Sequence, residues 1–148
     1  TALDVTVQAQ IFDLLKDLQA ETNTAIILIT HDMGAIAEMA DQVLVMYAGK
    51  KVEDAPVDEI LSAPMHPYTQ GLIACVPHLH AEPPIERPKL AEIPGVVPSV
   101  MELSRGGCPF APRCSDVMDQ CRTAMPPPTA VGERHAVACW LRQPGAGA

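Results

Sequence analysis

The sequence predicts an α/β fold in which an incomplete sheet is followed by a loop-rich, cysteine-containing extension. Helix-like and strand-like segments alternate in the first part of the chain. All 15 prolines lie from Pro56 onward, so regular structure is expected before this point, and loops, turns and short helices after it. Four of the five cysteines lie between positions 108 and 139. We therefore expect two parts, residues 1–62 and residues 63–148.

The first two expected elements are a helix and a buried strand. Apolar residues recur at helical spacing from Val7 to Leu18, which predicts an amphipathic helix. Asp4 is placed to cap the start of this helix with its carboxylate. Residues 25–30 form a continuous apolar run rich in β-branched side chains, which is typical of a parallel strand buried on both faces.

The later elements are expected to be short. A helix is predicted from Gly34 to Ala40, a second strand from Val43 to Tyr47, and a tight turn at Ala48–Gly49 that leads into residues 50–54. Two further short helices are expected over residues 58–62 and 68–75. Helix, strand, helix and strand in this order favour an α/β sheet with too few strands to be complete.

Charge and hydropathy exclude several functional classes. Residues 1–62 hold 11 acidic and 3 basic residues, and residues 63–148 hold 7 of each. Neither part has the excess of Lys and Arg that nucleic-acid binding requires, so no nucleic-acid partner is expected. No apolar run approaches the roughly 18 residues of a membrane helix, and the chain does not open with a secretion signal.

His31 directly follows the apolar run, where open α/β sheets place their ligands. A histidine there can contact a phosphate oxygen and orient an attacking water. It can equally satisfy a backbone group at the strand end, and position alone leaves both interpretations open.

The surrounding sequence resembles the end of an ABC-transporter ATPase domain. The matching segments are TALD at the start, AIILITHDM, and then DQVLVMYAGK, in the family's order and spacing over residues 1–62. The resemblance implies that Thr1, Ala2, Leu3 and Asp4 form the D-loop, which lies across the interface with a second ATPase subunit. It implies that His31 is the switch histidine, which contacts the γ-phosphate of ATP, with Mg²⁺ bound in the intact protein.

Other parts of the family's nucleotide site are not found in the 148 residues. The sequence contains no GxxxxGK[ST] loop to hold phosphates and magnesium. The Gln loop, the LSGGQ-type signature and the acidic strand end are also missing. The intact family member is an ATPase, but we expect this chain alone to be inactive. Asp32, next to His31, is expected to be structural or solvated.

The second part resembles the C-terminal extension of the oligopeptide/dipeptide branch of this family. The similar strings are PMHPYTQ from Pro64, IPGVVPSV from Ile93 and GCPFAPRC from Gly107. The resemblance implies a subunit that energises di- or oligopeptide import from the cytoplasmic face of the cell membrane. Its partners would be two membrane permease subunits and, indirectly, a substrate-binding protein. His66 is read as a loop or helix-cap residue, with metal binding as the alternative.

The clustered cysteines are candidate metal ligands. Their spacing is C-x5-C-x6-C-x17-C, wider than the close pairs of structural zinc sites. Members of the branch with these cysteines are associated with a [4Fe–4S] cluster; zinc and free thiols remain alternatives. The set comprises Cys108, Cys114, Cys121 and Cys139.

Neighbouring residues have expected roles as well. Arg113 and Arg122 each adjoin a cysteine and could balance the negative charge of a cluster. Trp140 is expected to pack against the cysteine loop, and Cys75, which stands apart, is expected in the core.

Two other functional hypotheses remain at this point. The chain could be a stand-alone regulatory module that binds a metal or an iron–sulfur cluster, with the incomplete sheet as scaffold. It could also be a non-functional truncation product. The module hypothesis requires a soluble, monodisperse chain, whereas the incomplete sheet predicts an exposed edge and poor stability.

Overall fold

The computed structural model describes residues 4–76, 91–103 and 106–144. The described residues form two compact units, which divide between Asp41 and Gln42, and each unit is described by itself. The first three residues of the expected D-loop, Thr1, Ala2 and Leu3, lie outside the described residues.

The first unit begins with helix α1, Val5–Thr22. As expected, the Asp4 carboxylate caps this helix, since its Oδ1 accepts a hydrogen bond from the backbone N–H of Thr6 at 2.8 Å. The helix ends at Asn23, which adopts the left-handed conformation with φ 52° and donates its N–H to the carbonyl of Gln19.

Helix α2, Met33–Met39, is capped by Asp32. The Asp32 Oδ1 accepts from the backbone N–H of Gly34 at 2.8 Å, and this hydrogen bond is the main reason why the pKa of Asp32 is lowered. The structural reading of Asp32 is therefore confirmed. An exposed ion pair of 3.0 Å between Lys16 and Glu38 links the two helices.

The strand predicted over residues 25–30 does not form. This segment carries no strand assignment, and the side chains of Ile27 and Ile29 are 89% and 92% exposed. The prediction was wrong because a strand exists only when neighbouring strands satisfy its N–H and C=O groups. In the part of the chain described, no strand pairs with this segment.

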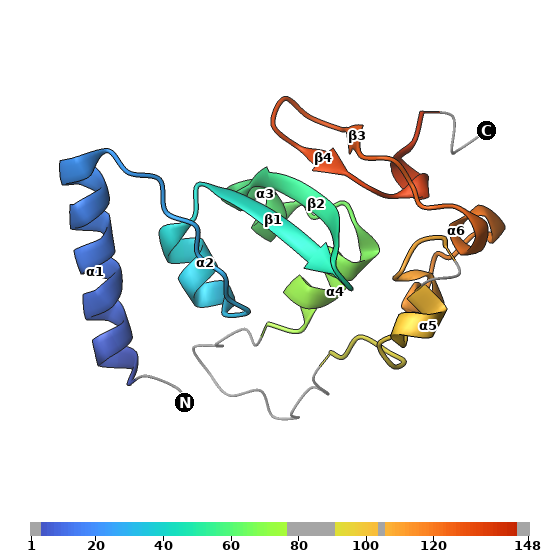
Figure 1. Ribbon diagram of the computed structural model, residues 1–148, viewed down its shortest axis with the longest axis horizontal. Helices are drawn as coiled ribbons and strands as arrows, with labels where there is room; N and C mark the ends of the chain where they lie inside the picture. The colour runs from blue at the N-terminus through green and yellow to red at the C-terminus, as the bar shows by residue number, and fades with distance from the viewer. Residues whose placement is uncertain (1–3, 77–90, 104–105, 145–148) are drawn as a thin grey trace, which may run out of the picture. The chain divides into compact units, whose positions relative to one another are not determined.

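The second unit is built on an antiparallel sheet in the order β1-β2-β4-β3 (Figure 1). Strand β1 spans Gln42–Tyr47, β2 Lys50–Pro56, β3 Thr129–Ala130 and β4 Ala136–Val137. The strand predicted over residues 43–47 is confirmed. The fold is mixed helix and strand with an open four-stranded sheet, consistent with an incomplete α/β architecture.

The predicted turn between β1 and β2 is also confirmed. Ala48 and Gly49 both have positive φ, 46° and 76°, and Tyr47 pairs directly with Lys50. Consecutive positive φ values suit a two-residue hairpin, because the twist of such turns matches the right-handed twist of the strands.

Short helices connect and cover these strands. Helices α3 and α4 agree with the predicted positions to within one residue at each end. The elements are α3 Val57–Ser62, α4 Pro67–Ala74, α5 Val100–Leu103, the 3₁₀ helix η1 Ala111–Arg113, α6 Asp119–Thr123, and the 3₁₀ helix η2 Trp140–Arg142.

The core of the second unit joins residues from both sides of position 62. Val52 of β2 and Val137 of β4 are fully buried. Tyr47, Tyr68 and Phe110 pack around Val52 as an aromatic cluster with T-shaped or tilted ring contacts, and their ring centroids lie 4.7 to 5.4 Å apart. The two compact units divide after Asp41. The expected division after residue 62 refers to segments that resemble different parts of the family, and it stays a prediction. No helix among the described residues has the length and apolar character needed to cross a membrane.

Candidate functional site

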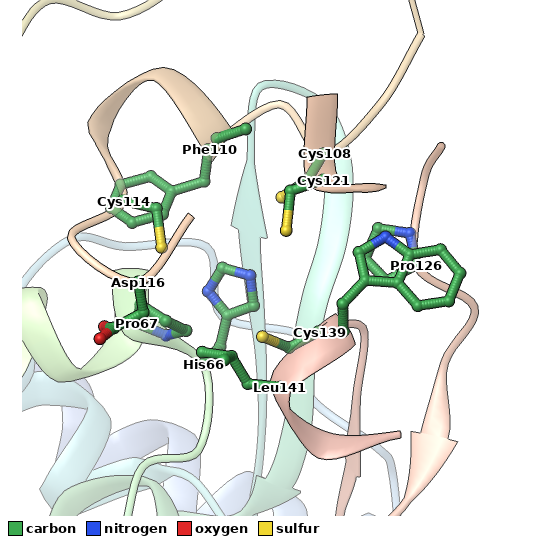
Figure 2. Close-up of a pocket in the computed structure, with 12 residues that line it drawn as sticks. His66, Pro67, Cys108, Phe110, Cys114, Asp116, Cys121, Pro126, Cys139 and Leu141 are labelled. Atoms are coloured by element: carbon green, nitrogen blue, oxygen red, sulfur yellow. The ribbon is translucent and has the colours of Figure 1, made fainter. Parts of the chain in front are cut away.

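The four clustered cysteines, which three separate segments supply, line one small pocket with His66 (Figure 2). Apolar side chains form most of the remaining wall, so the sulfur atoms lie in a site of low polarity. The cavity is about 20 Å³, enough for a water molecule in the conformation described. The other lining residues are Pro67, Phe110, Ala111, Asp116, Pro126, Trp140 and Leu141.

Cys108 and Cys121 are brought together by a close approach of their backbones. The N–H of Cys108 donates to the carbonyl of Cys121 at 2.7 Å. Gly107 makes this possible, because its φ is 83° and a Cβ there would lie 2.7 Å from the Cys121 carbonyl oxygen. Only glycine fits both the conformation and the space.

Cys114 and Cys139 reach the pocket by different routes. The tight η1 turn separates Cys114 from Cys108 and begins next to Phe110, which is anchored in the core. Cys139 follows strand β4, where the N–H of Ala138 donates to the carbonyl of Val52 at 2.8 Å. The sheet register therefore sets the position of Cys139.

Burial and backbone hydrogen bonds act in opposite directions on these thiols. Burial raises the pKa of Cys108 and Cys114 and raises that of Cys139 to about 11. Each of the three sulfurs also accepts from the backbone N–H two residues further on, which lowers its pKa. The donors are Phe110 for Cys108, Asp116 for Cys114 and Leu141 for Cys139.

The pocket lining includes four cysteine sulfurs, a donor type that metal clusters use. Buried thiols become thiolates when a metal centre supplies positive charge, and backbone N–H groups directed at the sulfurs support the charged form. Within the described ranges, no three His, Cys, Asp or Glu side chains converge as a site for one metal ion.

His66 has two roles in this geometry. As expected, it caps a helix, since its Nδ1 accepts from the backbone N–H of Tyr68 at 3.0 Å at the start of α4. Its ring also lines the cysteine pocket and lies 5.9 Å from the ring of Phe110. Burial lowers the pKa of His66 to about 4, so the ring is neutral near pH 7.

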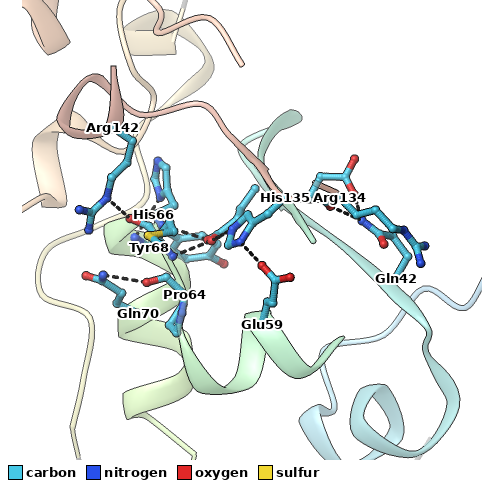
Figure 3. Close-up of polar contacts among 12 residues, drawn as sticks. Gln42, Glu59, Pro64, His66, Tyr68, Gln70, Arg134, His135 and Arg142 are labelled. Carbon is cyan, nitrogen blue, oxygen red and sulfur yellow. Dashed lines mark hydrogen bonds and ion pairs between the residues drawn. The ribbon is translucent and has the colours of Figure 1, made fainter. Parts of the chain in front are cut away.

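A buried polar network holds the turn that carries His66 (Figure 3). The carboxylate of Glu53, on β2, is 1% exposed and accepts from the N–H groups of Met65 at 2.6 Å and His66 at 3.0 Å. It also lies 2.8 Å from Nε2 of His135, whose Nδ1 lies 2.7 Å from Glu59. Sequence reasoning missed this network, because Glu53 and His135 are far apart in sequence and neither belongs to a recognisable motif.

Some expectations about the cysteine neighbours need correction. Arg113 does not line the pocket. Its guanidinium donates to the carbonyls of Ile93 and Pro94 at 2.7 and 2.8 Å, so it anchors a loop. Cys75 is half-buried rather than part of the core. Trp140 does line the cysteine pocket, as expected.

The two candidate residues of the nucleotide site lie in the first unit. His31 is exposed and directly precedes Asp32, the cap of α2. Asp4 is exposed and caps α1. Their expected roles at a phosphate and at a subunit interface stay predictions.

Comparisons with known proteins find similarity to one family over most of the chain. Residues 52–121 match the family described as "Oligopeptide/dipeptide transporter, C-terminal region". The oligopeptide transport ATP-binding protein AppD of Bacillus subtilis is 48% identical over 141 residues, covering 95% of this chain and 42% of that protein. The oligopeptide transport ATP-binding protein OppD of Mycobacterium tuberculosis is 49% identical over 139 residues, covering 94% of this chain and 22% of that protein.

A protein of Brucella ovis named as a peptide import ATP-binding protein is 47% identical over 141 residues, which is 94% of this chain. The chain spans about two fifths of the length of that relative. Similarity to such proteins therefore extends over nearly the whole chain, on both sides of the region that the family description matches. Residues 52–121 thus resemble the C-terminal region of oligopeptide/dipeptide transporters, and nearly the whole chain is similar to part of ATP-binding proteins named for peptide import.

Proposed function

We propose that the chain is part of the ATP-binding subunit of an ABC importer that energises uptake of di- or oligopeptides. The observation that carries this proposal is the 46–49% identity to peptide and oligopeptide ATP-binding proteins over at least 94% of the chain. In the complete subunit, ATP and Mg²⁺ bind between two ATP-binding subunits on the cytoplasmic face of the membrane. Two permease subunits and a substrate-binding protein complete the transporter.

In this proposal, His31 contacts the γ-phosphate and Thr1–Asp4 crosses the subunit interface. An exposed imidazole beside a helix cap is free to take up such a contact, which supports the assignment. Phosphoryl transfer depends on positioning and charge stabilisation by many groups together. Since the 148 residues contain no phosphate-binding loop, we expect the purified chain to hydrolyse no ATP.

A chimera tests the transport role. The matching segment of the Bacillus subtilis relative is replaced by this chain, and uptake of a labelled oligopeptide is measured in cells that lack that relative. We expect the chimera to restore uptake and His31→Ala in the chimera to abolish it. Glu21→Ala, at an exposed position of α1, serves as the control and should retain uptake. Failure of the chimera at normal expression, or full uptake with His31→Ala, would refute the proposal.

The coding sequence upstream of Thr1 separates the remaining hypotheses. An in-frame phosphate-binding loop, signature motif and acidic strand support the ATP-binding subunit. A start codon with its own promoter at Thr1 would instead support a separate module.

We further propose that the four cysteines hold a [4Fe–4S] cluster with a structural role. The support is the single pocket that all four line, with backbone N–H groups directed at three of the sulfurs. Such a cluster would cross-link three segments of the second unit. Its iron would supply the positive charge that makes buried thiolates stable.

Metal analysis after anaerobic purification tests the cluster. We expect a brown protein with about four iron and four sulfide ions per chain. Substitution of any pocket cysteine by serine should lower the iron content severely. Cys75→Ser is the matched control, because Cys75 does not line the pocket, and it should keep the iron. A colourless protein, or one that contains zinc in place of iron, would overturn this proposal.

A further inference from the structure

The side chain of His66 enters the cysteine pocket without being suited to bind metal there. Figure 2 shows its imidazole between the segments that carry Cys114, Cys121 and Cys139. A ring nitrogen that binds a metal must offer a lone pair. In His66, Nδ1 already uses its lone pair to accept from the N–H of Tyr68 at 3.0 Å.

The tautomer of His66 follows from this hydrogen bond. A neutral imidazole carries one proton, and because Nδ1 is an acceptor, the proton lies on Nε2. His66 is 1% exposed, and among the described residues the buried side-chain atom without a hydrogen-bond partner is Thr69 Oγ1, not His66 Nε2. The Nε2–H is therefore the donor that the ring offers to the pocket that it lines.

The surroundings of His66 hold it in this orientation. Glu53 binds the backbone N–H of His66, and Arg142 and Gln70 donate to the carbonyls of Met65 and Pro64 at 3.3 and 2.9 Å. The ring therefore cannot turn away from the pocket without breaking the helix cap and loosening this turn. Such fixed outer contacts are typical of residues that tune a metal centre.

We propose that His66 is a positioning residue, which donates its Nε2–H to the sulfur atoms of the group held by the four cysteines. This inference rests on the proposed cluster site. In this inference the ligands of the group are four thiolates, without a histidine. His66, the histidine of the HPYT string, then acts as a hydrogen-bond donor as well as a helix cap. A hydrogen bond to cluster sulfur stabilises the reduced state, which carries more negative charge, and so raises the reduction potential.

Two substitutions separate the two roles of His66. In His66→Asn the side-chain oxygen is placed like Nδ1 and can keep the helix cap, but the donor towards the pocket is lost. In His66→Gln the longer amide can place an N–H near the position of Nε2, but the cap is lost. If His66 serves only as a helix cap, His66→Gln should perturb the protein more than His66→Asn. If His66 donates to the cluster, His66→Asn should change the reduction potential more than His66→Gln.

The experiment is a spectroscopic redox titration of the purified 148-residue chain with its iron bound. At the wild-type midpoint, we expect the ratio of reduced to oxidised cluster to fall about tenfold in His66→Asn, the factor for one lost hydrogen bond. His66→Gln should stay near the wild-type ratio while its melting temperature falls. Equal potentials in wild type and His66→Asn, at equal iron content, would overturn the inference.

Nitrogen NMR of the histidine rings keeps the inference testable if the cluster proposal fails. Iron analysis of the wild type decides the cluster independently of His66. In a metal-free or zinc-bound chain, the Nε2–H tautomer of His66 supports the donor role. An Nδ1–H tautomer, or a metal bound to Nε2, refutes it.

Discussion

At the residue scale, Gly107 is the position on which the cysteine pocket most depends. It lets the backbone of Cys108 lie against that of Cys121, and both cysteines line the pocket. Gly106 has the same φ of 83° but more room, since a Cβ there would lie 3.8 Å from the nearest backbone atom. Comparing substitutions at Gly106 and Gly107 therefore separates the stability cost of the close backbone approach from the stability cost of positive φ.

Gly107→Ala should lower the free energy of unfolding by about 1–3 kcal/mol more than Gly106→Ala, because only at residue 107 must the backbone move. Urea unfolding followed by fluorescence of Trp140, the single tryptophan, measures this difference in the second unit. Equal losses in the two variants would show that the close approach has no energetic weight.

Glu53 provides a second test at this scale. Its buried carboxylate accepts from the backbone N–H groups of Met65 and His66 and lies 2.8 Å from Nε2 of His135. A glutamine amide has only one oxygen in place of the two carboxylate oxygens. Glu53→Gln should therefore cost about 1–3 kcal/mol, the penalty for leaving a buried hydrogen-bond donor unsatisfied. Glu59→Gln, whose side chain is 47% exposed, should cost less than about 1 kcal/mol. Unfolding at neutral pH compares them, and similar losses would contradict the assigned importance of Glu53.

At the scale of elements, the β1–β2 hairpin depends on its two-residue turn. Gly49 has φ 76° and nothing lies within 4 Å of the position where a Cβ would be. Gly49→Ala should thus cost only the conformational term, about 1–2 kcal/mol. A melting-curve comparison tests this, and an unchanged melting temperature would indicate that the turn adopts another conformation in solution.

The segment at residues 25–30 shows how an element can depend on its neighbours. Its composition favours a strand strongly, yet it carries none of the hydrogen bonds of a sheet. A helix such as α1 satisfies its backbone internally, with help only from caps such as Asp4. A strand cannot do so, which is why the helix was predictable and the strand was not.

At the scale of the whole molecule, this segment predicts how the isolated chain behaves. Ile27 and Ile29 together present an exposed apolar surface with unpaired backbone groups, a template for association. We expect the purified 148-residue chain to self-associate in a concentration-dependent way, as measured by light scattering after size exclusion.

The double variant Ile27→Lys/Ile29→Lys should reduce this association strongly. The matched control is Val96→Lys/Val97→Lys, which also replaces two exposed apolar residues, at 84% and 58% exposure. If the control reduces association as much, or if the wild type is monomeric at all concentrations, the prediction fails.

Sequence patterns alone determined the features that arise from local interactions or from residue type. The cap at Asp4, the turn at Ala48–Gly49 and the helices near residues 58–62 and 68–75 depend on neighbours in sequence. The set of four cysteines was recognisable for another reason, since few side chains share their chemistry.

Only the tertiary structure decided the features that depend on contacts between distant segments. In the tertiary structure, residues 25–30 form no strand and Arg113 donates to a loop carbonyl. Glu53 lies within hydrogen-bond distance of His135. The tertiary structure also placed His66 at the cysteines, which no spacing rule predicts. The physical reason is that hydrogen-bond partners and burial are supplied by the packing of segments, and local sequence does not encode which segments will meet.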